Sequence, residues 1–126
     1  MKEKRGDKER RSSRRVKKTF YVQCRPFDTT AAWVSAVVQD ISEAGIKIYI
    51  MREFSVGEVL DIKISTFLRP ERLNILGTVV SCKESGGSGV MWVMRVSFTK
   101  ISEVDRVILR KLIQIFSQGL LKRGER

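Results

Sequence analysis

The chain has 126 residues, of which 42% are hydrophobic and 31% charged, with a formal net charge of +11 and no histidine. That composition is typical of one soluble domain, and no apolar stretch approaches the roughly 20 residues that a membrane-spanning helix needs. The absence of histidine removes the commonest general base and metal ligand, which disfavours an enzyme. The N-terminus is charged from Lys2 onward and lacks a secretory-signal pattern, so we expect a cytoplasmic protein.

The positive charge is concentrated at the N-terminal end. Residues 1–18 carry ten basic and three acidic side chains, a net charge of +7. This asymmetry favours an anionic partner such as a nucleic acid, a nucleotide or an acidic surface, although a solubilising tail fits equally well. Residues 1–15 lack an apolar period, so we expect a flexible basic segment in the absence of a ligand.

From Val16 onward, short runs of β-branched and aromatic residues alternate with turn residues. The alternation is clearest in Ile-Lys-Ile-Tyr-Ile at 46–50, which indicates a half-buried strand with its isoleucines on one face. Gly77 predicts a bulge where a barrel wall bends. The predicted strands span residues 19–24, 32–40, 46–50, 59–64, 74–82 and 91–98. The pattern predicts a mostly β fold, a six-stranded antiparallel β-barrel that closes its own edges.

The last predicted element has a helical period and completes a barrel-plus-helix domain over residues 16–118. Ser102 followed by Asp105 resembles a capping box and predicts the start of the helix. An apolar stripe at helical spacing should pack across the barrel, and it consists of Val104, Ile108, Leu112, Ile115 and Phe116. Gly119 predicts the end of the helix, followed by a basic tail at 119–126.

The cysteines and tryptophans have a structural interpretation. Cys24 and Cys82 lie inside strand patterns without the spacing of a metal site, so we expect two buried thiols and no metal. Trp33 and Trp92 are candidates for stacking on nucleic-acid bases, but packing in the core or at a barrel end is the favoured interpretation.

The first candidate binding motif immediately precedes the first strand. Residues 9–16 read Glu-Arg-Arg-Ser-Ser-Arg-Arg-Val, so that Arg10 pairs with Arg14, and Arg11 with Arg15, at a spacing of four. A guanidinium is a planar fork of donors that binds a phosphate or the O6/N7 edge of guanine with two hydrogen bonds. The motif therefore predicts a ligand that carries guanine, phosphate or both.

The second candidate motif, Asp-Ile-Ser-Glu-Ala-Gly at 40–45, lies between the second and third predicted strands. Asp40 offers acceptors for the N1–H and N2–H donors of guanine, and Ser42 offers a hydroxyl and a nearby backbone N–H for an anion. Gly45 is expected to supply the backbone freedom of a tight reversal. The same residues also fit an ordinary Asx-type turn.

The two motifs, followed by a barrel and a C-terminal helix, together resemble the PilZ domain family. The resemblance covers residues 9–116 and implies a non-enzymatic receptor for the second messenger cyclic di-GMP, which that family often binds as an intercalated dimer, with no other cofactor. By position, Arg11 and Arg15 match the arginines of the family, with Arg10 and Arg14 as the alternative one residue earlier. The resemblance assigns ligand contacts to Asp40, Ser42 and Gly45 in the same way.

One residue departs from the family pattern, which often has a small residue before Val-x-Phe in the sixth strand. Here Arg95 precedes Val96, Ser97 and Phe98, and it either alters local packing or adds a ligand contact. On this interpretation the arginine segment closes over the nucleotide and changes the surface presented to a downstream protein partner. Two alternatives stay open: a small basic barrel that binds RNA or DNA through its charged ends, and a family member that docks a partner without nucleotide.

Overall fold

The computed structural model describes residues 21–124, with side chains described as far as Ser117. The strands are β1 (Tyr21–Pro26), β2 (Val34–Ile41), β3 (Gly45–Ile50), β4 (Val59–Ile64), β5 (Leu73–Ser85) and β6 (Met91–Ile101), and the helix α2 (Glu103–Gly124) follows them. All six predicted strands are confirmed. The last two are longer than predicted: β5 continues to Ser85 in the hairpin with β6, and β6 continues to Ile101, which pairs with Ile75 near the start of β5.

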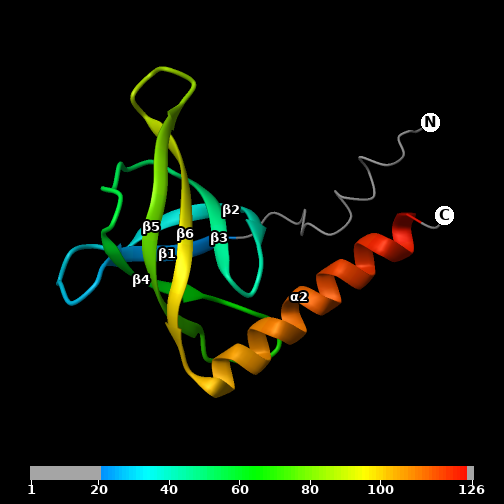
Figure 1. Cartoon of the computed structure of the whole chain (residues 1–126). Coiled ribbons are helices and arrows are strands. Elements are labelled where there is room, and N and C mark those ends of the chain that lie inside the picture. Colours follow the sequence, from blue (N-terminus) through cyan, green and yellow to red (C-terminus); the bar gives the residue numbers. More distant parts are fainter. Residues whose placement is uncertain (1–20, 125–126) are drawn as a thin grey trace.

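The strands close into one antiparallel barrel in the order β1, β2, β3, β6, β5, β4 (Figure 1). Closure is complete because β1 pairs with β2 on one side and with β4 on the other. A closed barrel leaves no row of unpaired backbone groups, which is how a small sheet avoids edge-to-edge aggregation. The predicted fold class is therefore confirmed.

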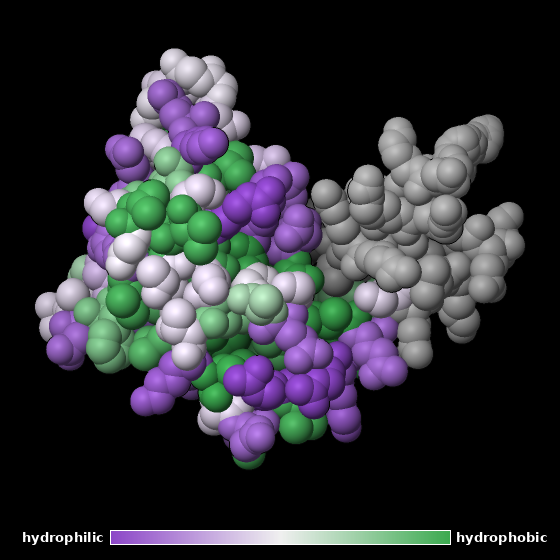
Figure 2. All heavy atoms as spheres, viewed as in Figure 1, coloured by the Kyte–Doolittle hydropathy of each residue, from purple (hydrophilic) through white to green (hydrophobic). Residues whose placement is uncertain are grey.

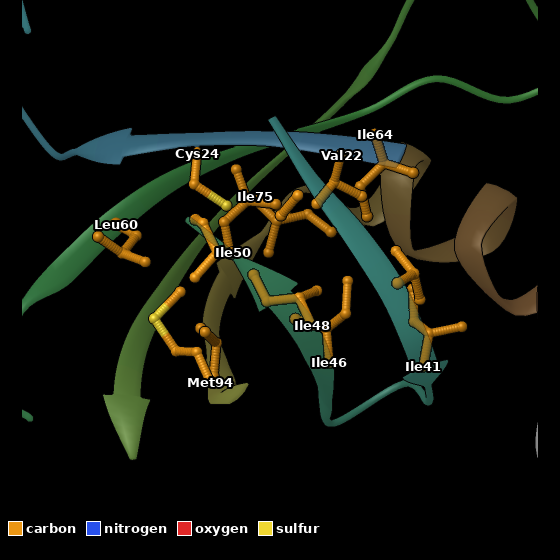
Figure 3. Close-up of a cluster of buried hydrophobic side chains, with 14 of the residues drawn as sticks. Val22, Cys24, Ile41, Ile46, Ile48, Ile50, Leu60, Ile64, Ile75 and Met94 are labelled. Atoms are coloured by element: carbon orange, nitrogen blue, oxygen red, sulfur yellow. The ribbon is translucent and has the colours of Figure 1, made fainter. Parts of the chain in front are cut away.

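The barrel interior is filled by every second residue of each strand. On β3, Ile46, Ile48 and Ile50 are at most 4% exposed, and Figure 3 shows them pointing into one cluster with Cys24 and Met94. Burying one such aliphatic side chain contributes about 1.5–3 kcal/mol relative to its exposure to water. The residues between them, including Lys47, consequently face outward.

The predicted irregularity at Gly77 is confirmed, although the extra residue belongs to the partner strand. The β5–β6 register shifts between Leu76 and Gly77, which leaves Thr99 of β6 without an opposite residue. A Cβ at Gly77 would lie 2.5 Å from Cγ1 of Val96. The glycine is therefore required by close packing against β6.

Ser102 caps the helix as predicted, since its Oγ accepts a hydrogen bond from the backbone N–H of Asp105 at 3.1 Å. The carboxylate of Asp105 does not complete the predicted capping box. It is only 7% exposed and instead accepts hydrogen bonds from the guanidinium of Arg69 and from the backbone N–H of Asn74. Asp105 thus joins the helix start to the segment that leads into β5.

The anchoring of Asp105 rotates the buried face of α2 away from the predicted stripe. Leu109 and Leu112, one and two turns further along, are 1% and 2% exposed, whereas Val104 and Ile115 are 63% and 41% exposed. The predicted stripe was therefore wrong at Val104 and Ile115. Figure 2 shows a surface on which hydrophobic and hydrophilic patches are interleaved.

The helix also continues through Gly119, where its end was predicted, to Gly124. A glycine inside a helix costs about 1 kcal/mol relative to alanine, which does not end a helix unless the backbone also turns into the left-handed conformation. The second half of α2 extends away from the barrel (Figure 1).

Candidate ligand-binding site

The β2–β3 turn, residues 42–44, is held by its own hydrogen bonds. The backbone N–H of Ser42 donates to the carbonyl oxygen of Gly45 at 2.9 Å, and the backbone N–H of Ala44 donates to Oγ of Ser42 at 3.1 Å. The predicted backbone donor beside Ser42 is therefore already occupied within the turn. The exposed Ser42 hydroxyl also donates to the carbonyl oxygen of Gly45, at 3.5 Å, so a ligand contact would exchange this long hydrogen bond.

A bulge in β2 turns Asp40 toward the outside of the barrel. Val38 lies opposite Ile48 and Asp40 lies opposite Lys47, so Gln39 is an extra residue without an opposite partner. Simple alternation would place Asp40 on the inner face with Val38, but one inserted residue reverses the alternation. Asp40 consequently faces outward, while Ile41 enters the core at 4% exposure.

Gly45 is needed for space rather than for a left-handed backbone. The residues with positive φ in the described chain are Asp28, Gly57, Gly86, Gly87 and Gly89. A Cβ at Gly45 would lie 2.3 Å from the carbonyl oxygen of Val96 on β6. The expectation of a conformational role was therefore wrong, and the glycine instead lets β3 approach β6 closely at the site.

An ion pair connects the turn to the helix. Nε of Arg110 lies 3.1 Å from Oε2 of Glu43, and its terminal nitrogen lies 3.3 Å from Oε1. These hydrogen bonds, and to a lesser extent the negative charge of Glu43, raise the pKa of Arg110 above its ordinary value. This ion pair neutralises Glu43, the acidic residue of the turn. Asp40, beside the turn, has no ion pair within the described residues.

The four predicted arginines, Arg10, Arg11, Arg14 and Arg15, lie outside the described residues. Of the predicted site residues, the structure brings Asp40, Ser42 and Gly45 together at the β2–β3 turn. The sequence analysis did not include Lys47 among the candidate site residues. The alternation of β3 placed its side chain on the outer face, but only the register between β2 and β3 places it opposite Asp40.

Trp33 is half-buried and its ring is already covered by cations. The guanidinium carbon of Arg25 lies 4.3 Å from the ring centroid and Nζ of Lys63 lies 5.3 Å from it. Trp92 packs against the barrel core. The packing interpretation is favoured for both tryptophans, since each ring is engaged within the fold.

Two surface hollows lie away from the turn. One is bordered by Phe27, Asp61 and Ser102 and the other by Arg25, Asp28 and Asp61. Neither of these two hollows includes Asp40, Ser42 or Gly45.

The described side chains contain no cluster of cysteine or acidic residues that could hold a metal ion. Cys24 is a free, buried thiol. Its burial, and to a lesser extent the negative charge of Asp61, raises its pKa from 9.0 to about 12. Cys82 is also free and only partly buried, in contrast to the expectation that both thiols are buried. Among the described helices, none is long and apolar enough to cross a bilayer.

A closed six-stranded antiparallel barrel followed by a C-terminal helix defines a class of small β-barrel domains. A sequence model described as the PilZ domain matches residues 9–114, and the chain belongs to this family. That range contains both the arginine segment and the Asp40–Gly45 turn.

Two solved structures have the same fold. One is the Bacillus subtilis inhibitor of motility (MotI/DgrA), with a TM-score of 0.67, 16% identity, and coverage of 83% of this chain and 50% of that one. The chain thus spans half the length of that protein. The other is the PilZ domain of YcgR from Escherichia coli with cyclic di-GMP, with a TM-score of 0.61, 11% identity, and coverage of 86% and 88%. No curated protein sequence matches the chain.

Proposed function

We propose that the protein is a non-enzymatic receptor for cyclic di-GMP. The observation that carries this proposal is the PilZ match over residues 9–114, because the matched range includes both motifs with the chemistry that a guanine dinucleotide requires. The YcgR structure, which contains cyclic di-GMP, shares the barrel and helix and supports the same ligand.

Each motif has a distinct role in this proposal. Arg11 and Arg15, or Arg10 and Arg14 in the alternative alignment, bind guanine edges and phosphates with their guanidinium forks. Asp40 accepts hydrogen bonds from the N1–H and N2–H groups of one guanine. Its outward orientation and lack of an ion pair in the described part of the chain leave it available for that contact.

The turn supplies shape as well as contacts. Ser42 provides an exposed hydroxyl, and Gly45 lets the two strand backbones approach each other beneath the ligand. When nucleotide binds, the arginine segment closes over it and changes the surface that a downstream protein contacts.

Isothermal titration with cyclic di-GMP tests the proposal. We expect saturable binding that also gives the stoichiometry, and a loss of more than tenfold in affinity for Arg11→Ala and Arg15→Ala. The matched control is Arg5→Ala, which removes one positive charge from the same segment outside the motif and should leave binding nearly unchanged.

Two results would contradict the proposal. One is an absence of heat at micromolar ligand with folded protein. The other is tight binding to RNA or DNA of any sequence that falls steeply with salt and is not displaced by cyclic di-GMP, which would favour the basic-barrel alternative.

A further inference from the structure

Two cations share the outer wall of the barrel with Asp40. Asp40 on β2 is opposite Lys47 on β3, and Lys47 is in turn opposite Arg95 on β6. Arg95 stands between Met94 and Val96, which are 0% and 2% exposed, so its side chain points outward as that of Lys47 does. The three charged residues therefore form one row across three adjacent strands.

The placement of Lys47 opposite Arg95 is unfavourable for the barrel by itself. Side chains of directly opposite residues start about 4.5–5.5 Å apart at their Cβ atoms, and like charges in that position destabilise a sheet. In the described part of the chain the ion pairs are Arg69 with Asp105 and Arg110 with Glu43. Within that part, neither Lys47 nor Arg95 has a carboxylate at ion-pair distance, and Asp40, which lies opposite Lys47 alone, offsets only part of the repulsion.

An anion that binds both cations would offset it. The backbone N–H groups of Ser42 and Ala44 already donate within the turn, so Lys47 and Arg95 are the charged donors that this row offers to a phosphate. Lysine supplies a compact charge with three donors, and arginine supplies a fork that binds phosphate with two hydrogen bonds.

We propose that Lys47 and Arg95 together bind phosphate groups of the cyclic dinucleotide, so that the site extends from the turn across β3 to β6. This inference rests on the proposed function. Neighbouring strands are about 4.8 Å apart, so Asp40 and Arg95 start about 10 Å apart, a span that one dinucleotide covers between a guanine and a phosphate.

The test compares Lys47→Gln and Arg95→Gln with the wild type by calorimetric titration of cyclic di-GMP. Each variant should lose about tenfold or more in affinity, because a hydrogen bond to a charged group contributes about 1.5–3 kcal/mol. The matched control is Lys100→Gln, an exposed lysine near the other end of β6, which should change affinity less than about twofold.

A second measurement separates binding from structure. Without nucleotide, Arg95→Gln should melt at the same temperature as the wild type or higher, since it removes one member of a like-charged pair. Lys47→Gln also removes the positive charge opposite Asp40, so its melting temperature should stay close to that of the wild type. A residue with a structural role would instead lower the melting temperature.

The outcomes are distinguishable from those of the proposed function. If the wild type binds and both variants bind equally well, or if Lys100→Gln loses as much affinity as they do, the role of Lys47 and Arg95 is refuted while the receptor function stands. If the folded wild type fails to bind cyclic di-GMP, both proposals are refuted.

Discussion

The α-carbon of Gly45 lies so close to β6 that a Cβ on it would meet the carbonyl oxygen of Val96 at 2.3 Å. The obstacle is backbone, which cannot rotate away as a side chain can. The first residue of β3 is thus restricted to glycine by the strand opposite it, at the end of the turn that carries Ser42.

Gly45→Ala should therefore destabilise the barrel by about 1–3 kcal/mol, the usual cost of forcing extra volume into a packed position. Urea unfolding monitored by circular dichroism measures the change. Gly57→Ala is the control, because its Cβ would meet nothing within 4 Å and only its φ of 93° opposes the substitution. A Gly45→Ala variant as stable as the wild type would show that β3 and β6 separate easily.

Asp105 should be the acidic residue on which the position of α2 depends. Its replacement by alanine leaves the Asn74 N–H without its acceptor and removes the carboxylate partner of Arg69. The guanidinium of Arg69 keeps the carbonyl oxygens of Glu71 and Arg72 as acceptors. We expect a loss of about 2–3 kcal/mol in the free energy of unfolding, since hydrogen bonds to charged groups are lost from a largely buried position.

Glu103→Ala is the matched control for Asp105→Ala. Glu103 is an exposed carboxylate in the same first turn, and removing it should cost about 0.3–1 kcal/mol, mainly through the helix dipole and to a lesser extent through its charge interaction with Arg110. Equal effects of the two substitutions in thermal or urea unfolding would contradict the anchoring role of Asp105.

Cys24 should make stability decrease at high pH. Its pKa is about 12 in the folded protein against an ordinary 9.0, so the native thiol stays protonated while the unfolded thiol ionises. The stabilisation is complete below about pH 9 and is lost as the pH rises toward 12, by at most about 1.4 kcal/mol per pH unit.

The measurement is the free energy of unfolding at several pH values from about 8 to about 11 for the wild type and Cys24→Ala. Other groups that titrate in this range affect both proteins, so the difference in slope isolates the thiol. Parallel curves would show that burial of Cys24 does not hold its proton.

Much of the fold was predictable from local patterns. The alternation in β3 predicted which residues enter the core, and Ser102 predicted the helix start, because strand faces and helix caps depend on residues close together in the chain. The Asp-x-Ser-x-x-Gly pattern likewise located the turn between β2 and β3.

Only the tertiary structure decided what surrounds that turn. The extra residue Gln39 reverses the facing of Asp40, and a bulge is a property of two paired strands rather than of one sequence segment. The rotation of α2 depends on Asp105 meeting Arg69, and the row of Lys47 and Arg95 depends on β3 pairing with β6. Local sequence determines which face of a strand is buried in the barrel. The pairing of strands in the closed barrel determines which side chains, far apart in the sequence, lie together on the outer face.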